Sequence, residues 1–588
     1  MNRLLPLARA VRLHVEPGMH LHFASTPSRS NAAVREVARA FLDRRPDFVL
    51  SSTGFHSSAH TLALLGLGRR YLSCFFGDNY PTPRPNALYR RLAKEDALEH
   101  WSLLTYVLAL RAAALGHPYA VTTSLGHSDL GAALARAGRL FEVQDPAGGS
   151  EPLRLLAPIV PDVTFVHAPL GTTSGRVLCS APFGEGFHGA LAARRGVIVT
   201  VERIVDESEL DAFAHLVPLP TARVLAIAEE PYGAHPQPLY VGGALPGVTG
   251  YGDDFAAYEE WRERAERPEL FAQYRREVLE AEDGRAAYLE FIGAARLEAL
   301  GLPARRSSWS ERPTVPFDEE RSPFDRRTSP STYRPRRSVE TLPASERLIL
   351  LAARTIARRV ELARHGAVLA GIGQAFSAAR LALLLSGAAA ESVELLVETG
   401  ISGFDAREAH PFLLSARNMA AARRLSSVED NLGINACGAQ NRCLAVVGCA
   451  EADAGGNLNS SFVGGELIVG SGGASDLTAG AREVVVLCRS ERLVSRVEFV
   501  TSPGERVRAI VTEDGVLERS STAEEWQLTD AGLGTRSAAE LCAALPFAVR
   551  VASDSRALPP SDAELAALAE VVPETSAAPR AQNGRAHA

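Results

Sequence analysis

Residues 367–387, AVLAGIGQAFSAARLALLLSG, combine an apolar strand, a glycine turn and a helix rich in alanine and leucine. A second apolar strand, VELLVETG, follows at 393–400. Two short strands joined by a helix form a parallel unit, because a crossover of that length returns the chain in the same direction. Strands without polar alternation need helices on both faces of their sheet. The stretch therefore predicts an open α/β domain.

The same alternation of strands and helices runs through the rest of the chain. Further strands are expected at 163–170, 196–205, 223–231, 443–453 and 482–488, and further helices at 30–45 and 102–116. Strands that alternate with helices are typical of α/β proteins with parallel sheets. We therefore predict two open, mostly parallel α/β domains.

A charged, proline-rich stretch divides the chain, whose 588 residues are too many for one core. Residues 304–345 carry dense mixed charges and no apolar periodicity, which is typical of a linker. The first domain is therefore expected at 1–303 and the second at 346–560. The polar sequence of 561–588 predicts a disordered tail.

Lysine is almost absent, since Lys94 is the only one among 62 basic residues. A GC-rich coding bias, which the abundant alanine also suggests, is the simplest cause. A pyridoxal-type Schiff base or a phosphate-binding loop would nevertheless have to use Lys94. Lys94 lies in a charged helical pattern with no glycine-rich loop before it. The sequence therefore disfavours chemistry that depends on lysine.

Charge and composition exclude further classes of protein. The net charge of −7 argues against general binding to nucleic acid. No apolar run reaches the roughly 20 residues of a membrane helix, and the N-terminus lacks the pattern of a signal peptide. Cys437, Cys443 and Cys449 have no histidine nearby and fit no zinc pattern, so no metal is expected. Unpaired cysteines favour a reducing compartment, which makes the cytoplasm the expected location.

Glu398 is the strongest single candidate for chemistry. It ends the apolar strand in VELLVETGISGFD (393–405), where ligands bind in open α/β sheets. Glycines follow it and would let a substrate approach the backbone. A glutamate is ionised at neutral pH and needs no general base to act as a nucleophile. The alternative is a helix-capping or salt-bridged acid at a strand end, which local sequence alone would favour.

Two glycine turns are candidate binding loops. The first opens a helix and consists of Gly371, Ile372, Gly373 and Gln374. The second lies in VGSGGASD (469–476) and includes Gly472, Gly473 and Ala474. Free N–H groups at a helix start can hold a phosphate or an oxyanion. The first turn is equally consistent with tight packing, and neither has the spacing of a dinucleotide site.

His235 lies in a loop shaped by prolines, PYGAHPQPLY at 231–240. A lone histidine is more often structural than catalytic, and no further ligand lies at metal-binding spacing. No GxSxG motif occurs, so a serine hydrolase is not supported.

Together, in this order, these segments resemble the family I coenzyme A transferases, closest to the glutaconate CoA-transferase branch with both subunits fused. The segments that carry the resemblance are 109–130, 161–177 and 231–240 in the first half, and LAGIGQ (369–374), LLVETGISG (395–403), 450–465, GSGGASD (470–476) and 497–504 in the second. Their order over some 500 residues is more specific than any one motif.

The resemblance implies an enzyme in which Glu398 attacks an acyl-CoA thioester. The resulting acyl-glutamyl anhydride is opened by CoA to a glutamyl-CoA thioester, and a second carboxylic acid reverses the steps in ping-pong order. The two glycine turns would hold CoA or stabilise oxyanions, with CoA as a substrate and no tightly bound cofactor. The first half would build the acyl pocket, and the family suggests a homo-oligomer, a dimer or larger.

The first half departs from the family in two places, which makes the acyl group uncertain. Relatives have a Gly-Gly-Phe-like loop where this chain has HFASTPSRSN (22–31), so Ser25, Thr26 and Arg29, together with His235, are candidate pocket residues. LGTTSGRV (170–177) replaces a family Asp-x-x-Gly-Asn stretch. Relatives that hydrolyse ring CoA esters or decarboxylate lack the glutamate, and such chemistry could use Glu99 instead. A non-catalytic CoA-ester binding protein is a third alternative.

Overall fold

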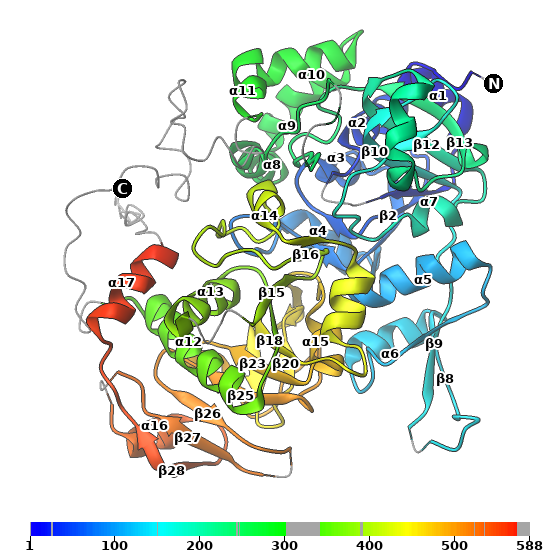
Figure 1. Ribbon diagram of the computed structural model, residues 1–588. Helices are drawn as coiled ribbons and strands as arrows, with labels where there is room; N and C mark the ends of the chain where they lie inside the picture. The colour runs from blue at the N-terminus through cyan, green and yellow to red at the C-terminus, as the bar shows by residue number, and fades with distance from the viewer. Residues whose placement is uncertain are drawn as a thin grey trace, which may run out of the picture.

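The chain forms two α/β halves, one above the other in Figure 1. The computed structural model describes residues 2–572 except 25–27, 150, 243, 244, 246, 302–341, 388–391, 523, 534 and 535. The expected linker at 304–345 therefore falls almost wholly outside the described residues. Leu342 is buried and helix α12 begins at Ala344, so the second half starts slightly before the expected boundary.

An eight-stranded sheet forms the centre of the first half, in the order β13-β12-β10-β1-β2-β4-β6 with β11 beside β10. Its strands are β1 (His20–Phe23), β2 (Phe48–Ser51), β4 (Gly68–Ser73), β6 (Leu98–His100), β10 (Val163–Gly171), β11 (Val177–Leu178), β12 (Gly196–Ile204) and β13 (Val224–Glu229). All neighbours in that order are parallel, and only β11 is antiparallel. β10 is buried along its whole length, as its unbroken apolar sequence predicts.

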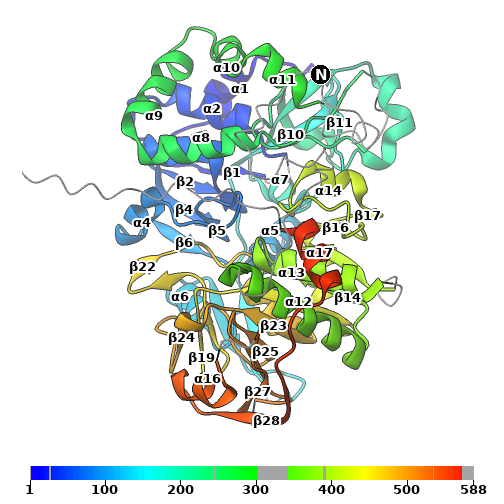
Figure 2. The ribbon, with the colours of Figure 1, turned by 90° about the vertical axis from the view of Figure 1, so that its left-hand side faces the viewer.

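Helices cover both sides of this sheet. They are α1 (Leu7–His14), α2 (Asn31–Ala40), α3 (His60–Leu64), α4 (Ala87–Lys94), α5 (Leu103–Leu115), α6 (Asp129–Arg136), α7 (His188–Ala192), α8 (Phe255–Glu266), α9 (Pro268–Tyr274), α10 (Gly284–Ile292) and α11 (Ala294–Ala299). Both views place α5 and α6 beside the second half (Figures 1 and 2). α5 starts with a capping box at Ser102, which fixes the residue where the helix begins.

A ten-stranded sheet forms the second half, in the order β17-β16-β15-β14-β18-β23-β25-β26-β27-β28. The strands are β14 (Ala367–Ala370), β15 (Glu394–Val397), β16 (Ile401–Ser402), β17 (Arg424–Leu425), β18 (Cys443–Gly448), β23 (Glu483–Leu487), β25 (Val507–Val511), β26 (Val516–Glu518), β27 (Trp526–Asp530) and β28 (Val549–Arg556). The central five, β15 to β25, are parallel. The predicted mostly parallel α/β class is confirmed for both halves.

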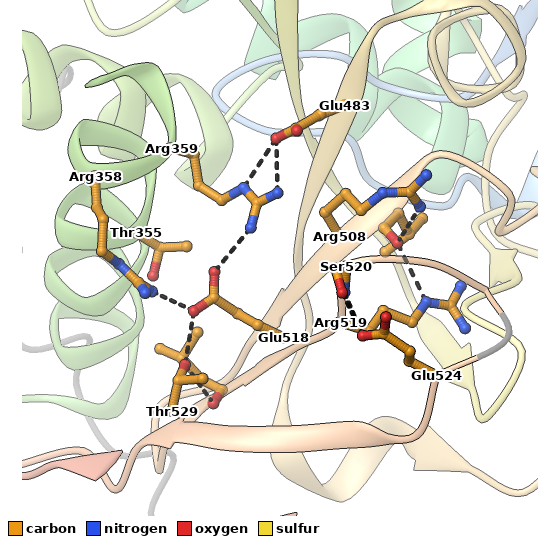
Figure 3. Close-up of polar contacts among 12 residues, drawn as sticks. Thr355, Arg358, Arg359, Glu483, Arg508, Glu518, Arg519, Ser520, Glu524 and Thr529 are labelled. Carbon is orange, nitrogen blue, oxygen red and sulfur yellow. Dashed lines mark hydrogen bonds and ion pairs between the residues drawn. The ribbon is translucent and has the colours of Figure 1, made fainter. Parts of the chain in front are cut away.

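The helices of the second half are α12 (Ala344–Ala363), α13 (Gln374–Ser386), α14 (Ala416–Ala421), α15 (Ala474–Gly480), α16 (Ala538–Ala544) and α17 (Asp562–Val571), with a π-helix, η8, at Glu429–Ala436. Ion pairs fasten α12 to the sheet (Figure 3). Arg359 joins Glu483 on β23 at 2.8 Å and Glu518 on β26 at 3.2 Å, and Arg358 also pairs with Glu518. These partly buried pairs set the helix against strands far away in sequence.

Two predicted boundaries need correction. The strand expected at 443–453 ends at Gly448, and β19 (Glu451–Asp453) joins a separate small sheet with β20 (Leu458–Asn459) and β24 (Leu493–Val494). The tail expected to be disordered from 561 begins with α17, whose Leu568 and Val571 are buried in the core of the second half. The apolar spacing of that helix outweighs the polar sequence beyond it, and residues 573–588 lie outside the described part.

No helix in the described part of the chain is long and apolar enough to cross a membrane.

Candidate active site

Glu398 immediately follows the buried strand β15, at the carboxyl edge of the parallel sheet. Asn431 fixes the turn, because its Nδ2 donates to the carbonyls of Val397 (2.9 Å) and Ile401 (3.1 Å). Gly400 has φ +106°, and a Cβ there would overlap the carbonyl of Ser426. The glycine after the glutamate is therefore required by the turn itself.

The second glycine turn closes over Glu398. The backbone N–H of Gly473 donates to the Glu398 carboxylate, and a Cβ on Gly473 would overlap Oε2 of that carboxylate. This close approach of backbone to side chain explains the dense glycine of 470–473, as the sequence suggests. The turn therefore presents a backbone donor to the candidate nucleophile.

The first half holds this turn in place. Gly472 donates from its N–H to the carbonyl of Cys74 at 3.0 Å and accepts from the N–H of Leu103 at 2.9 Å. Ser471 Oγ donates to the carbonyl of Trp101 at 3.2 Å. The position of Gly473 against Glu398 thus depends on contacts between the two halves.

Asp476 adds a second link between the halves. It is fully buried on α15, where Oδ1 accepts from Ser102 Oγ (2.7 Å) and Oδ2 from the N–H of Leu104 (3.0 Å). Both donors lie at the start of α5 in the first half. The Asp476 carboxylate, on α15 of the second half, therefore caps the start of α5 in the first half.

A cavity of about 100 Å³ lies between the halves beside Glu398. The first half supplies Thr53, Gly54, His56, Cys74, Phe75, Asn79, Leu103, Gly184, Gln237, Pro238, Asp253 and Tyr258, and the second half supplies Ile372, Glu398, Thr399, Phe412, Leu414 and Gly472. Two thirds of these residues therefore come from the half that does not carry the glutamate. An acyl group bound against Glu398 would contact both halves.

The first glycine turn reaches the same cavity through Ile372. Gly373, with φ +87°, precedes α13, and the N–H of Gly371 donates to the carbonyl of Val446 at 2.9 Å. One residue of each candidate turn, Ile372 and Gly472, therefore lines the cavity beside Glu398.

The protonation of Glu398 differs from the sequence-based expectation. Burial and the neighbouring charge of Asp476 raise the pKa of Glu398 to about 7, although the bond from Gly473 lowers it. At neutral pH the carboxyl is therefore only partly ionised, because burial removes water from it. A carboxylate with less hydration is also a stronger nucleophile once ionised.

Arg29 does not line the cavity. Its side chain is fully buried and donates to the carbonyls of Gly54 (2.8 Å) and His56 (3.0 Å), and to Asn31 Oδ1 (2.9 Å). It therefore supports the cavity wall from behind. The other two candidates on this loop, at positions 25 and 26, lie outside the described residues.

His235 is likewise fully buried and outside the cavity lining. Its ring bonds to Tyr288 Oη (2.7 Å) and Asp254 Oδ2 (2.8 Å), and burial lowers its pKa. These bonds position the loop whose next residues, Gln237 and Pro238, do line the cavity. His235 thus shapes the pocket indirectly, by holding the loop that lines it.

Glu99, the candidate for the alternative chemistry, is engaged elsewhere. Its Oε1 accepts from Trp101 Nε1 (3.0 Å) and Arg139 Nε (3.1 Å), and it is not among the cavity residues. Sequence reasoning missed His56, Cys74 and Asp253, because no motif marks them. Asp476 could have been found from its place directly after the glycines of GSGGASD.

Comparisons with known proteins agree with this geometry. Residues 5–226 match the family model described as Coenzyme A transferase. One of the subunits of a 3-oxoadipate CoA-transferase from Pseudomonas knackmussii is 33% identical over 163 residues, which are 28% of this chain and 52% of that relative. The chain thus spans about half the length of the curated relatives it matches.

One solved protein extends the likeness of fold to both halves. An acyl-CoA transferase, YdiF, from Escherichia coli O157:H7, solved as a thioester complex with CoA, has a TM-score of 0.64 at 14% identity and covers 98% of each chain. A glutaconate coenzyme A-transferase from Acidaminococcus fermentans has a TM-score of 0.44 at 22% identity, covering 51% of this chain and 95% of that one.

The two α/β halves share the fold of the solved acyl-CoA transferase, here in one chain. The sequence match to the coenzyme A transferase family covers residues 5–226 of the first half. The place of the whole chain within that family stays a prediction.

Proposed function

We propose that the chain transfers CoA between an acyl-CoA and a carboxylic acid, with Glu398 as the covalent nucleophile. The observation that carries the proposal is the position of Glu398, which lines the cavity between the two halves and accepts a bond from the N–H of Gly473. Burial and the like charge of Asp476 destabilise the ionised carboxylate of Glu398, which favours its attack on an acyl carbon.

The proposed reaction has two halves. The Glu398 carboxylate attacks the thioester carbonyl of acyl-CoA, the C–S bond breaks, and CoA leaves as a thiolate. The thiolate then attacks the glutamyl carbonyl of the anhydride and releases the first carboxylic acid. A second carboxylate reverses these steps on the resulting glutamyl-CoA thioester.

The surrounding residues have supporting roles in this proposal. Developing oxyanions need fixed donors, which the N–H groups of the 371–374 and 472–474 turns would supply. The same turns are the proposed contacts for CoA, which is a substrate rather than a bound cofactor. Arg29 and His235 hold the wall of the acyl pocket, and a homo-oligomer remains a prediction.

Intact-mass and peptide mapping after incubation with acyl-CoA tests the proposal. A CoA-sized adduct is expected on the peptide that contains Glu398, sensitive to hydroxylamine or borohydride, and absent from Glu398→Ala. The matched control is Glu394→Ala, which removes a partly buried glutamate four residues earlier on the same strand. Full turnover by Glu398→Ala would refute the nucleophile. Release of free CoA or carbon dioxide without an acceptor acid would support the hydrolase or decarboxylase alternatives.

A further inference from the structure

The charges on the cavity wall restrict the acyl group that the cavity can hold. None of the described lining residues is an arginine or lysine, whereas Asp253 and Glu398 are both carboxylates. Most of the remaining wall is apolar, with Phe75, Leu103 and Phe412 among its members. A substrate group that carries a negative charge would meet acids and no cation there.

Asp253 lines the cavity, and the protein holds both oxygens of its carboxylate. Its Oδ1 accepts from Tyr258 Oη (2.9 Å) and its Oδ2 from the N–H of Ala416 (3.0 Å). Burial raises its pKa to about 6, so the group remains mostly ionised at neutral pH. Its negative charge is therefore a permanent feature of the pocket under those conditions.

Arg29, behind the same wall, is fully buried and donates hydrogen bonds within the protein. Its guanidinium donates to Asn31 Oδ1 and to the carbonyls of Gly54 and His56, with a longer contact to Ser57 Oγ at 3.4 Å. All of its nitrogens have acceptors within the protein. A carboxylate in the cavity could not form the paired bonds that arginine gives to such groups.

His56 is the polar group of the wall that lacks a partner. It is 8% exposed, it lines the cavity, and its buried Nδ1 has no hydrogen-bond partner among the described residues. Burial and the charge of Arg29 hold the pKa of His56 well below its usual range, so the ring is neutral. The protein closes off Nδ1, so a ligand in the cavity would bond to Nε2, the accessible nitrogen of the ring.

We propose that the acyl group of this enzyme carries no second carboxylate and instead bears a neutral hydroxyl or carbonyl that hydrogen-bonds to His56. This specificity rests on the proposed CoA-transferase function. A second carboxylate would be desolvated next to Asp253, with no cationic side chain on the cavity lining to pair with it, which disfavours its binding. A neutral imidazole can donate to a carbonyl or bond to a hydroxyl, so it suits either group.

Three CoA esters with four-carbon acyl groups test the proposal: 3-hydroxybutyryl-CoA, butyryl-CoA and succinyl-CoA. They differ in the presence of a hydroxyl or a second carboxylate while chain length stays constant. We expect kcat/KM to fall at least tenfold from the hydroxyl ester to the plain ester, and at least tenfold again to succinyl-CoA. Equal rates, or a preference for succinyl-CoA, would overturn the specificity.

Variants then assign the preference to residues. His56→Phe should bring the ratio of kcat/KM between hydroxybutyryl-CoA and butyryl-CoA close to one. Asp253→Asn should raise the relative use of succinyl-CoA about tenfold, since it removes the negative charge at nearly constant shape. His117→Phe, at an exposed position, is the matched control and should leave both ratios unchanged. Unchanged ratios in both cavity variants would refute the assignment, and Asp253→Asn decides it if His56→Phe does not fold.

Adduct mapping separates this proposal from the function on which it rests. If Glu398 forms a CoA adduct most readily with succinyl-CoA, the transferase mechanism stands and the specificity fails. If no adduct and no transfer occur with any of the three esters or with acetoacetyl-CoA, the proposed function fails and the specificity fails with it.

Discussion

A group of acids in the first half and the Glu398–Asp476 pair in the second half have opposite surroundings. Four acids of the first half face histidines, in the pairs His22–Glu185 (2.6 Å), His60–Asp78 (2.9 Å), His167–Glu202 (2.8 Å) and His235–Asp254 (2.8 Å). In the second half Glu398 and Asp476 have no cationic partner among the described residues. Instead, the negative charge of Asp476 acts on Glu398.

The pKa values follow this difference. Burial would raise the pKa of Asp254, but bonds from His235 and Arg296 outweigh it and hold the pKa below its usual range. Burial raises the pKa of Asp476 to about 6, despite bonds from Leu104 and Ser102, and that of Glu398 to about 7. Acids with a cationic partner thus support the fold, whereas Glu398 lines the cavity without such a partner and keeps a titratable charge available for chemistry.

The largest effect is expected from breaking a paired acid. Asp254→Ala removes bonds to His235 and Arg296 and the cap of α8, where Oδ1 accepts from the N–H of Ala257 at 2.9 Å. The free energy of unfolding should fall by about 3–5 kcal/mol, because buried donors lose their partner. Denaturant unfolding of the variant and the parent measures the loss.

The matched control is Asp211→Ala. Asp211 is 71% exposed and pairs with Arg176 at 2.9 Å, so its removal should cost less than about 1 kcal/mol. Equal losses in the two variants would show that the buried pairs are no more structural than a surface pair.

A second variant disturbs the unpaired acid without altering its charge. Gly473→Ala places a Cβ against Glu398 Oε2 and close to Leu432. The carboxylate must move, and we expect kcat/KM to fall about 10²-fold, the cost of displacing a reacting group by about 1 Å. Steady-state kinetics on a folded variant, checked by circular dichroism, measure the fall.

Gly472→Ala is its neighbouring control. Gly472 has φ +54°, but nothing lies within 4 Å of a Cβ built there. Its replacement should cost about 1 kcal/mol of stability through the backbone and less than tenfold in rate. A rate loss as large as that of Gly473→Ala would mean that backbone strain, not contact with Glu398, governs the site.

The third prediction concerns pH. Glu398 attacks as a carboxylate, so its active fraction grows as pH rises, and kcat/KM should increase through pH 7 and then level off. Asp476→Asn removes the like charge that raises the pKa of Glu398. The midpoint should therefore move to lower pH, by about one unit, which corresponds to ~1.4 kcal/mol. A shift to higher pH would contradict the like-charge coupling.

The nature of these acids explains how much the sequence could predict. Glu398 and the glycines around it are contiguous in sequence, so a strand end and a glycine turn identify them. The strands β10, β12 and β18 are equally visible as unbroken apolar runs. Local sequence carries both kinds of information because both depend on the backbone near the residue itself.

The acyl pocket was harder to predict because it depends on distant residues. Arg29 and His235 were expected to touch substrate. Instead, Arg29 donates to the carbonyls of Gly54 and His56, and the His235 ring bonds to the Asp254 carboxylate. Whether a polar side chain faces a cavity or a carbonyl depends on which segments pack beside it. His56 and Asp253 line the cavity only because the halves meet there, and no local pattern reports that.

The smallest expected effect is a gain in stability on removing the charge of Glu398, whereas removing Asp254 is expected to lower stability. It tests most directly whether Glu398 lacks a cationic partner. An acid whose pKa is raised in the fold contributes stability fully below its unfolded pKa of 4.5, and that contribution is lost as pH rises through about 7. Glu398→Gln keeps an acceptor for the N–H of Gly473 and has no charge to bury. Relative to the parent, the variant should therefore gain about 1 kcal/mol between pH 5 and pH 8, a value reduced for the opening of the carboxylate to the cavity. Unfolding at the two pH values measures the gain, and a parent that is relatively more stable at pH 8 would mean that Glu398 is held by a counter-charge, like the acids of the first half.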